Sequence, residues 1–201
     1  MMAWKSERWL NEVFPGEHEL FSKYTDLTDR ELAIVAAGTL DLALAELINK
    51  RLVNLPKESC AFLGLDESGS APAGSMGARI QLALLLGIIR PEDARILRII
   101  KNVRNKFAHR INVSFLDDSI QGLLSKLLNE WSERSRFLLR SQSEQAQCAS
   151  EEGLKYLKGN LGKVPEAGEG LLLAVFSVYQ AYFYRLSSRI ERVGLVVGER
   201  A

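Results

Sequence analysis

Residues 96–110, which read ILRIIKNVRNKFAHR, decide the fold of this chain. Their apolar side chains recur at steps of three, one, three and four residues, which places them on one face of an α-helix. These side chains are Ile96, Ile99, Ile100, Val103 and Phe107. The other face carries cationic and amide groups, with Arg104, Asn105 and His109 near its end. We therefore expect an amphipathic helix with one face in a core and a polar end at the surface.

The composition is that of a protein with one hydrophobic core. The 201 residues are 47% apolar and 25% charged, and the net charge is +1. A nearly neutral chain has no overall attraction to nucleic acids or to membranes. The two cysteines, Cys60 and Cys148, and the two histidines match no metal or disulfide spacing. We expect a cytoplasmic protein without a metal or cofactor, and no apolar run approaches the about 20 residues of a membrane span.

The clearest helix start lies upstream of this stretch. Thr28 and Glu31 have the spacing of a capping box, and helix-forming residues follow to about Val53. Asp41 is an acidic residue within a largely apolar part of this helix. We expect it to be solvated, the alternative being an ion pair with a cation from the helix of Arg104.

The remaining segments also favour helices. Residues 76–89 are apolar nearly all round, which predicts a central helix, and a break at residues 159–170 precedes a final helix to about Val193. No segment alternates with a period of two for long enough to be a strand. We predict an all-α bundle of about six or seven helices. Residues 1–24 form an N-terminal arm and residues 25–140 the core. Residues 141–201 form a C-terminal extension that packs on the core or on a partner chain.

Four blocks of sequence, in this order, resemble the mannitol operon repressor (MltR) family. They are TDRELAIV at 28–35, GSMGARI at 74–80, LLGII at 85–89 and RNKFAH at 104–109. The resemblance covers roughly residues 25–130 and implies a helical protein that represses transcription of genes for sugar-alcohol uptake. The sequence shows no short helix-turn-helix pair with a basic recognition helix. We therefore expect regulation through a protein partner and no direct sequence-specific binding to DNA.

The RNKFAH block also resembles the signature of HEPN domains, which are helical, often dimeric, and in many cases metal-independent ribonucleases. The resemblance implies that His109 is the base, Arg104 the cation that stabilises charge on phosphorus, and Asn105 an orienting group. Arg104 precedes His109 by five residues, about 140° around a helix. A symmetric homodimer would bring two such helix ends into one cleft.

A purely structural role is the alternative for these residues. Arg104 would then pair with Asp41 or Glu46, Asn105 would bond to backbone, and His109 and Arg110 would cap the last carbonyls of their helix. If the region binds a ligand, the further binding residues that we predict are Arg79, Lys101, Asn102, Lys106 and Arg110. We favour a non-enzymatic regulator, with an RNA-cleaving enzyme as the second hypothesis.

Overall fold

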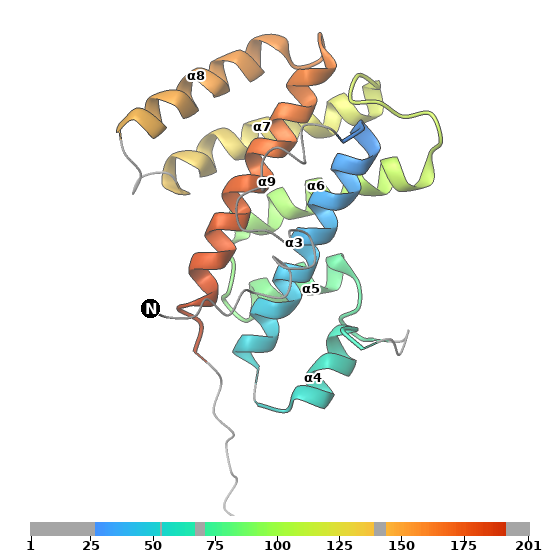
Figure 1. Ribbon diagram of the computed structural model, residues 1–201, viewed down its shortest axis with the longest axis vertical. Helices are drawn as coiled ribbons and strands as arrows, with labels where there is room; N and C mark the ends of the chain where they lie inside the picture. The colour runs from blue at the N-terminus through green and yellow to red at the C-terminus, as the bar shows by residue number, and fades with distance from the viewer. Residues whose placement is uncertain (1–26, 53, 67–70, 139–143, 192–201) are drawn as a thin grey trace, which may run out of the picture.

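The computed structural model describes residues 27–52, 54–66, 71–138 and 144–191 (Figure 1). Within these ranges the chain forms seven helices and no strand, which confirms the predicted all-α bundle. In chain order they are α3 (Asp29–Arg51), α4 (Pro56–Leu63), α5 (Met76–Leu85), α6 (Pro91–His109), α7 (Asp118–Leu138), α8 (Glu144–Asn160) and α9 (Pro165–Ser187). The predicted N-terminal arm, residues 1–24, lies outside the described residues.

Helix α3 is the centre of the bundle. It begins where the capping box predicts, because the Thr28 hydroxyl accepts a hydrogen bond from the Glu31 amide, and the Glu31 carboxylate accepts one from the Thr28 amide at 2.9 Å. Figure 1 shows α9 running alongside α3, and α3 also contacts α4, α5 and α6. Because helices pack against α3 on several sides, it has buried residues on all of its faces. Small side chains permit this close packing, namely Ala33, Ala36, Ala37, Ala43 and Ala45.

Helix α5 is shorter and less buried than its sequence predicts. It ends at Leu85, where we expected it to reach Ile89, because Gly87 adopts a left-handed backbone with φ of 68°. Leu85 is 74% exposed, so the prediction that this segment is the central helix is wrong. The apolar composition misleads because α5 packs on α3 and α6 through one face only.

Helix α6 forms as the sequence predicts. Pro91 occupies its first turn, where a missing amide hydrogen does no harm. Along the apolar stripe, Ile96, Ile100, Val103 and Phe107 are at most 1% exposed, whereas Ile99 is only partly buried. The stripe faces α3 and α7, the two helices that α6 contacts most. The opposite, polar side is therefore left at the surface.

The C-terminal helices complete the same core. Helix α8 lies within the predicted C-terminal extension, residues 141–201. Helix α9 begins at Pro165, inside the predicted break, and ends at Ser187, short of Val193. It packs on α3 and α7, so within the described chain the extension packs on the core, the first of the two predicted possibilities.

One glycine allows α9 to approach closely. A Cβ atom on Gly168 would lie 2.8 Å from the Cβ of Phe115, closer than real side chains approach. Phe115 belongs to the connection between α6 and α7, and its ring packs against Phe107 at 5.1 Å between centroids. The glycine thus lets α9 press on the segment that follows the polar end of α6. No described helix combines the length and apolarity that a membrane span requires.

Candidate functional site

A surface groove of about 380 Å³ lies at the C-terminal end of α6. Its lining contains five of the eight candidate residues that the sequence singles out, together with one leucine from α7. They are Asn102, Asn105, Lys106, His109, Arg110 and Leu123. Helix geometry explains the convergence, because residues three, four and seven positions apart lie on one side of an α-helix. Asn105 and His109 of the predicted motif therefore lie in the wall of a single groove.

The polar groups of the groove wall are available to a ligand. His109 is exposed, and the described residues offer its imidazole no hydrogen-bond partner. Lys106 is partly exposed and also has no carboxylate of the described chain within ion-pair distance. Arg110 donates a hydrogen bond of 3.3 Å to the hydroxyl of Ser119. The groove thus offers positive charge that the described part of the chain does not neutralise.

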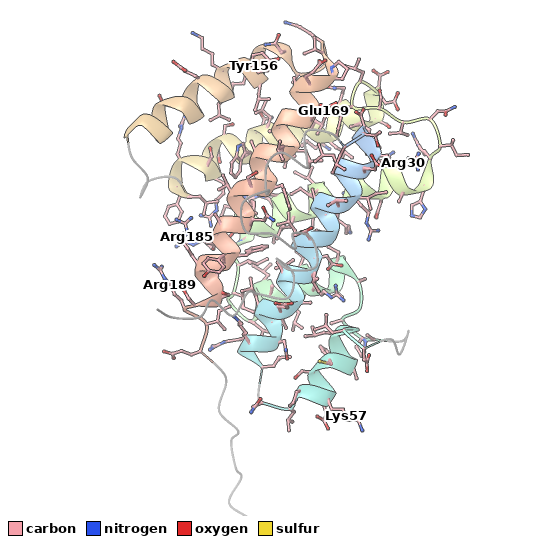
Figure 2. All side chains as sticks on the ribbon, viewed as in Figure 1. Arg30, Lys57, Tyr156, Glu169, Arg185 and Arg189 are labelled. Atoms are coloured by element: carbon pink, nitrogen blue, oxygen red, sulfur yellow. The ribbon has the colours of Figure 1, made fainter. Side chains whose placement is uncertain are left out.

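Helix α3 supports the groove from behind. The Arg30 guanidinium donates hydrogen bonds to the backbone carbonyls of Arg110 and, at 2.7 Å, of Ile111 (Arg30 is labelled in Figure 2). These two carbonyls lie just after the last turn of α6, so Arg30 fixes the start of the following connection to α3. The Arg110 side chain bonds to Ser119, and the His109 side chain has no hydrogen-bond partner among the described residues, so neither caps the last carbonyls of α6 as their structural role predicted.

Asp29 fixes the next part of the connection. Its carboxylate accepts a hydrogen bond of 2.9 Å from the amide of Phe115, and Gln121 donates one to the carbonyl of the same residue. Sequence analysis missed Arg30, Asp29 and Gln121 because they lie on other helices. Only the position of Asp29 and Arg30 in the first turn of a predicted helix could have drawn attention to them.

Arg104 does not line the groove. Its Nη1 donates a hydrogen bond of 3.1 Å to the Oδ1 of Asn105, so it contacts the motif through that amide. Asn105 therefore accepts a side-chain hydrogen bond, where its structural interpretation predicted a bond to backbone. Arg104 forms no ion pair with Asp41, but its charge helps to lower the pKa of that carboxyl. Within one chain, Lys106 and Arg110 are the cations nearest to His109 in the groove.

The prediction that Asp41 is solvated is wrong, and so is the alternative of a partner from α6. Asp41 pairs with Arg79 of α5 at 2.8 Å, because α5 packs directly on this part of α3. Burial raises the pKa of Asp41, against the opposing charges of Arg79 and Arg104. Its other carboxylate oxygen is buried without a hydrogen-bond partner in the structure.

Arg79 and Lys101 lie apart from the groove. The Arg79 guanidinium is buried and donates to the carbonyls of Ala73 at 3.0 Å and Leu63 at 2.6 Å, in addition to its ion pair. It holds α5 and the preceding loop to α3, so it is positioned as a structural residue. Lys101 lies on the α5 side of α6, where its Nζ would be 3.5 Å from a Cβ atom on Gly77.

A buried charge network at the other end of α6 escaped the sequence analysis. Asp93 is fully buried and accepts hydrogen bonds from the Arg134 guanidinium at 2.7 and 3.0 Å and from the Tyr179 hydroxyl at 2.8 Å. Burial, and then the neighbouring Asp93 charge, hold the pKa of Tyr179 well above its ordinary value.

Comparison with known proteins gives no guide to the chemistry of the groove. No family model, curated protein or solved structure matches this chain. The described residues contain no group of three or more His, Cys, Asp and Glu side chains that could hold a metal ion. What the groove offers is a set of amides, two cations and one imidazole, which suits the binding of an anion such as a phosphate group.

Proposed function

We propose that this chain is a helical regulator that works by binding a macromolecular partner at the α6 groove. The observation that supports this proposal is the gathering of Asn102, Lys106, His109 and Arg110 on one exposed wall without a neutralising carboxylate in the described chain. The resemblance to mannitol operon repressors makes repression of a sugar-alcohol operon the corresponding biological role, with a protein partner and a homodimer as the expected assembly.

The position of α6 argues against direct reading of operator DNA. A recognition helix must enter the major groove, which is about 12 Å wide. Helix α6 packs against α5 on one side and α7 on the other, so its polar face cannot enter that groove as a free helix. In a gel-shift experiment at about 150 mM salt, a near-physiological concentration, we expect the purified protein not to shift a DNA fragment that carries the mannitol-operon operator.

A reporter experiment tests the regulatory proposal. Expression from a mannitol-operon promoter should fall when the chain is present. The Lys106→Ala/Arg110→Ala variant should lose this repression while folding normally. The control is Lys57→Ala on α4, which should repress like the wild type. Figure 2 shows Lys57 at one end of the molecule and Glu169 of α9 at the other. Full repression by the groove variant would contradict the proposal.

Cleavage of RNA is the second candidate function, and the groove supplies the specific reason for it. A base must take the proton of the ribose 2′-hydroxyl while cations stabilise the charge that develops on phosphorus. His109 is an exposed imidazole in the same groove as Lys106 and Arg110. In one chain these two cations would serve the phosphate, and Arg104 would act by positioning Asn105 or by reaching a second copy.

The second candidate is tested with RNA directly. The full chain, in the presence of a chelator, should convert a labelled oligoribonucleotide into fragments with a 2′,3′-cyclic phosphate and a 5′-hydroxyl. The His109→Ala variant should abolish cleavage and retain the circular-dichroism spectrum and unfolding midpoint of the wild type. Cleavage that persists in His109→Ala would exclude His109 as the base.

A further inference from the structure

Helix α7 forms the second wall of the groove. Leu123 lines the groove, and the Ser119 hydroxyl accepts a hydrogen bond of 3.3 Å from Arg110. Lys126 lies three residues beyond Leu123 and seven beyond Ser119, so it is on the same side of α7. Lys126 is exposed and has no carboxylate of the described residues within ion-pair distance. The groove therefore has such a lysine on both sides, Lys106 on α6 and Lys126 on α7.

An exposed apolar side chain lies directly beside these cations. Ile111, the residue after Arg110, is 91% exposed. Its backbone is held in place, because Arg30 of α3 donates hydrogen bonds to the carbonyls of Arg110 and, at 2.7 Å, of Ile111. The Asp29 carboxylate holds the same connection further along, at the amide of Phe115. The fold thus fixes this backbone with the isoleucine in water, and burial of its side chain requires a partner.

We propose that the groove between α6 and α7 is the docking site for an acidic segment of a partner protein, with Ile111 as the apolar anchor. This inference rests on the proposed regulatory function and adds the chemistry of the partner. Carboxylates of the segment pair with Lys106, Lys126 and Arg110. An apolar side chain of the segment packs against Ile111 and Leu123. A helix in a groove presents such side chains at intervals of three, four and seven residues.

The lining of the groove favours an acidic peptide over a nucleic acid. Sites for single strands present aromatic side chains on which the bases stack. The described residues that line this groove include no phenylalanine, tyrosine or tryptophan. A phosphate backbone would also leave Ile111 in water, whereas the centre of a protein interface buries apolar side chains. Glu130, seven residues beyond Leu123, is already bound by Arg95 at 2.8 Å, so it does not neutralise the lysines.

Fluorescence anisotropy of a labelled peptide measures docking to the full chain. The probe has ~12 residues, with leucines at the spacing of a helix face and glutamates between them. It should bind, and its affinity should fall as salt is raised from ~0.05 to ~0.3 M, because salt screens exposed charges. The same peptide with lysine in place of every glutamate should not bind. Equal binding of the two peptides would overturn the inference.

Variants of the chain test the charges and the anchor separately. Lys106→Ala/Lys126→Ala should weaken binding about two- to fivefold per lysine and reduce its dependence on salt. Ile111→Ala should weaken it about tenfold, as expected for an apolar anchor. The matched controls are Lys57→Ala and Leu85→Ala, because Leu85 is also strongly exposed but lies on α5. Both controls should bind like the wild type, and unchanged affinity in Ile111→Ala would overturn the anchor.

The outcomes separate this inference from the regulatory function. If Lys106→Ala/Arg110→Ala loses repression in the reporter experiment but the glutamate peptide does not bind, the regulatory function stands and the acidic partner is wrong. If the peptide binds through Ile111 and Lys126 but Lys106→Ala/Arg110→Ala represses fully, the docking site stands and the regulatory function fails. If an oligouridine binds in this groove and the glutamate peptide does not, the ligand is a nucleic acid and the inference is wrong.

Discussion

The two ends of α6 use charge in opposite ways. At the N-terminal end, Asp93 is fully buried and is satisfied by Arg134, by Tyr179 and by the amide of Arg90. At the C-terminal end, Lys106 and His109 are turned to the surface and have no carboxylate partner in the described chain. One helix therefore carries a network that holds three helices together and a groove that is open to a ligand.

This difference between the two ends of α6 indicates which charged residues stabilise the fold and which are available for function. A buried ion pair that loses one partner leaves an uncompensated charge in the core, which is strongly destabilising. An exposed cation can be removed with little effect on folding, because water solvates it in both states. Variants at the two ends should consequently separate stability from binding.

The largest expected effect is at Asp93. Replacement by alanine leaves the Arg134 guanidinium, about 5% exposed, without its carboxylate. The free energy of unfolding in urea should fall by about 3–5 kcal/mol. The control is Glu130→Ala, which breaks the exposed ion pair with Arg95 and should lose less than about 1 kcal/mol. Equal losses in the two variants would contradict the contrast between buried and exposed charge.

A smaller effect is expected at Gly168, where α9 packs on the segment that follows α6. Gly168→Ala places a methyl group against Phe115 and should reduce the free energy of unfolding by about 1–3 kcal/mol through overpacking. Gly122→Ala is the matched control in α7, because nothing lies within 4 Å of its added Cβ atom. That substitution should stabilise the protein by about 0.5–1 kcal/mol. Thermal or urea unfolding of both variants decides the point.

At the groove, the expected change in stability is smaller still. Lys106→Ala and His109→Ala should each alter the free energy of unfolding by no more than about 0.5 kcal/mol. The same preparations should lose repression or RNA cleavage. A strongly destabilised His109→Ala protein would return His109 to a structural role.

The weakest effect concerns pH, at the contact between α9 and the start of α3. Burial, and then the hydrogen bond and negative charge of Asp29 together with the charge of Glu166, raise the pKa of Glu169 above its ordinary value of 4.5. The folded state therefore binds more protons than the unfolded state just above pH 4.5, and stability falls as pH rises through the raised pKa. Glu169→Gln should remove this component of the pH profile. Parallel profiles for the two proteins would exclude it.

Sequence alone predicted most of the helices, because local signals specify them. The capping box at Thr28 and the stripe from Ile96 to Phe107 each act within a few residues, and both are confirmed. The prediction for α5 was wrong because its burial depends on how many neighbours it has. For the same reason Asp41 was assigned to solvent although Arg79 lies beside it.

Some residues of the groove could likewise be predicted from local sequence, and others depend on distant parts of the chain. The spacing of Asn102, Lys106 and His109 along α6 places them on one side of a helix, so their convergence was readable from the sequence. The same helix geometry predicted that Arg104 and His109 lie on different sides of the helix. The sequence could not assign Leu123, Arg30 and Asp29 to the groove. Contacts between residues far apart in the chain depend on the packing of whole helices.

The sequence by itself determined that the chain is helical, and that one helix ends in amides, cations and an imidazole, because a period of 3.6 residues is a local property of the backbone. Only the tertiary structure decided that α3 is central, that Arg30 binds the carbonyls that follow α6, and that Asp93 is buried against Arg134. Those outcomes depend on which faces meet when the helices pack. The free energy of burying a face depends on its partner, which the pattern within one segment does not specify.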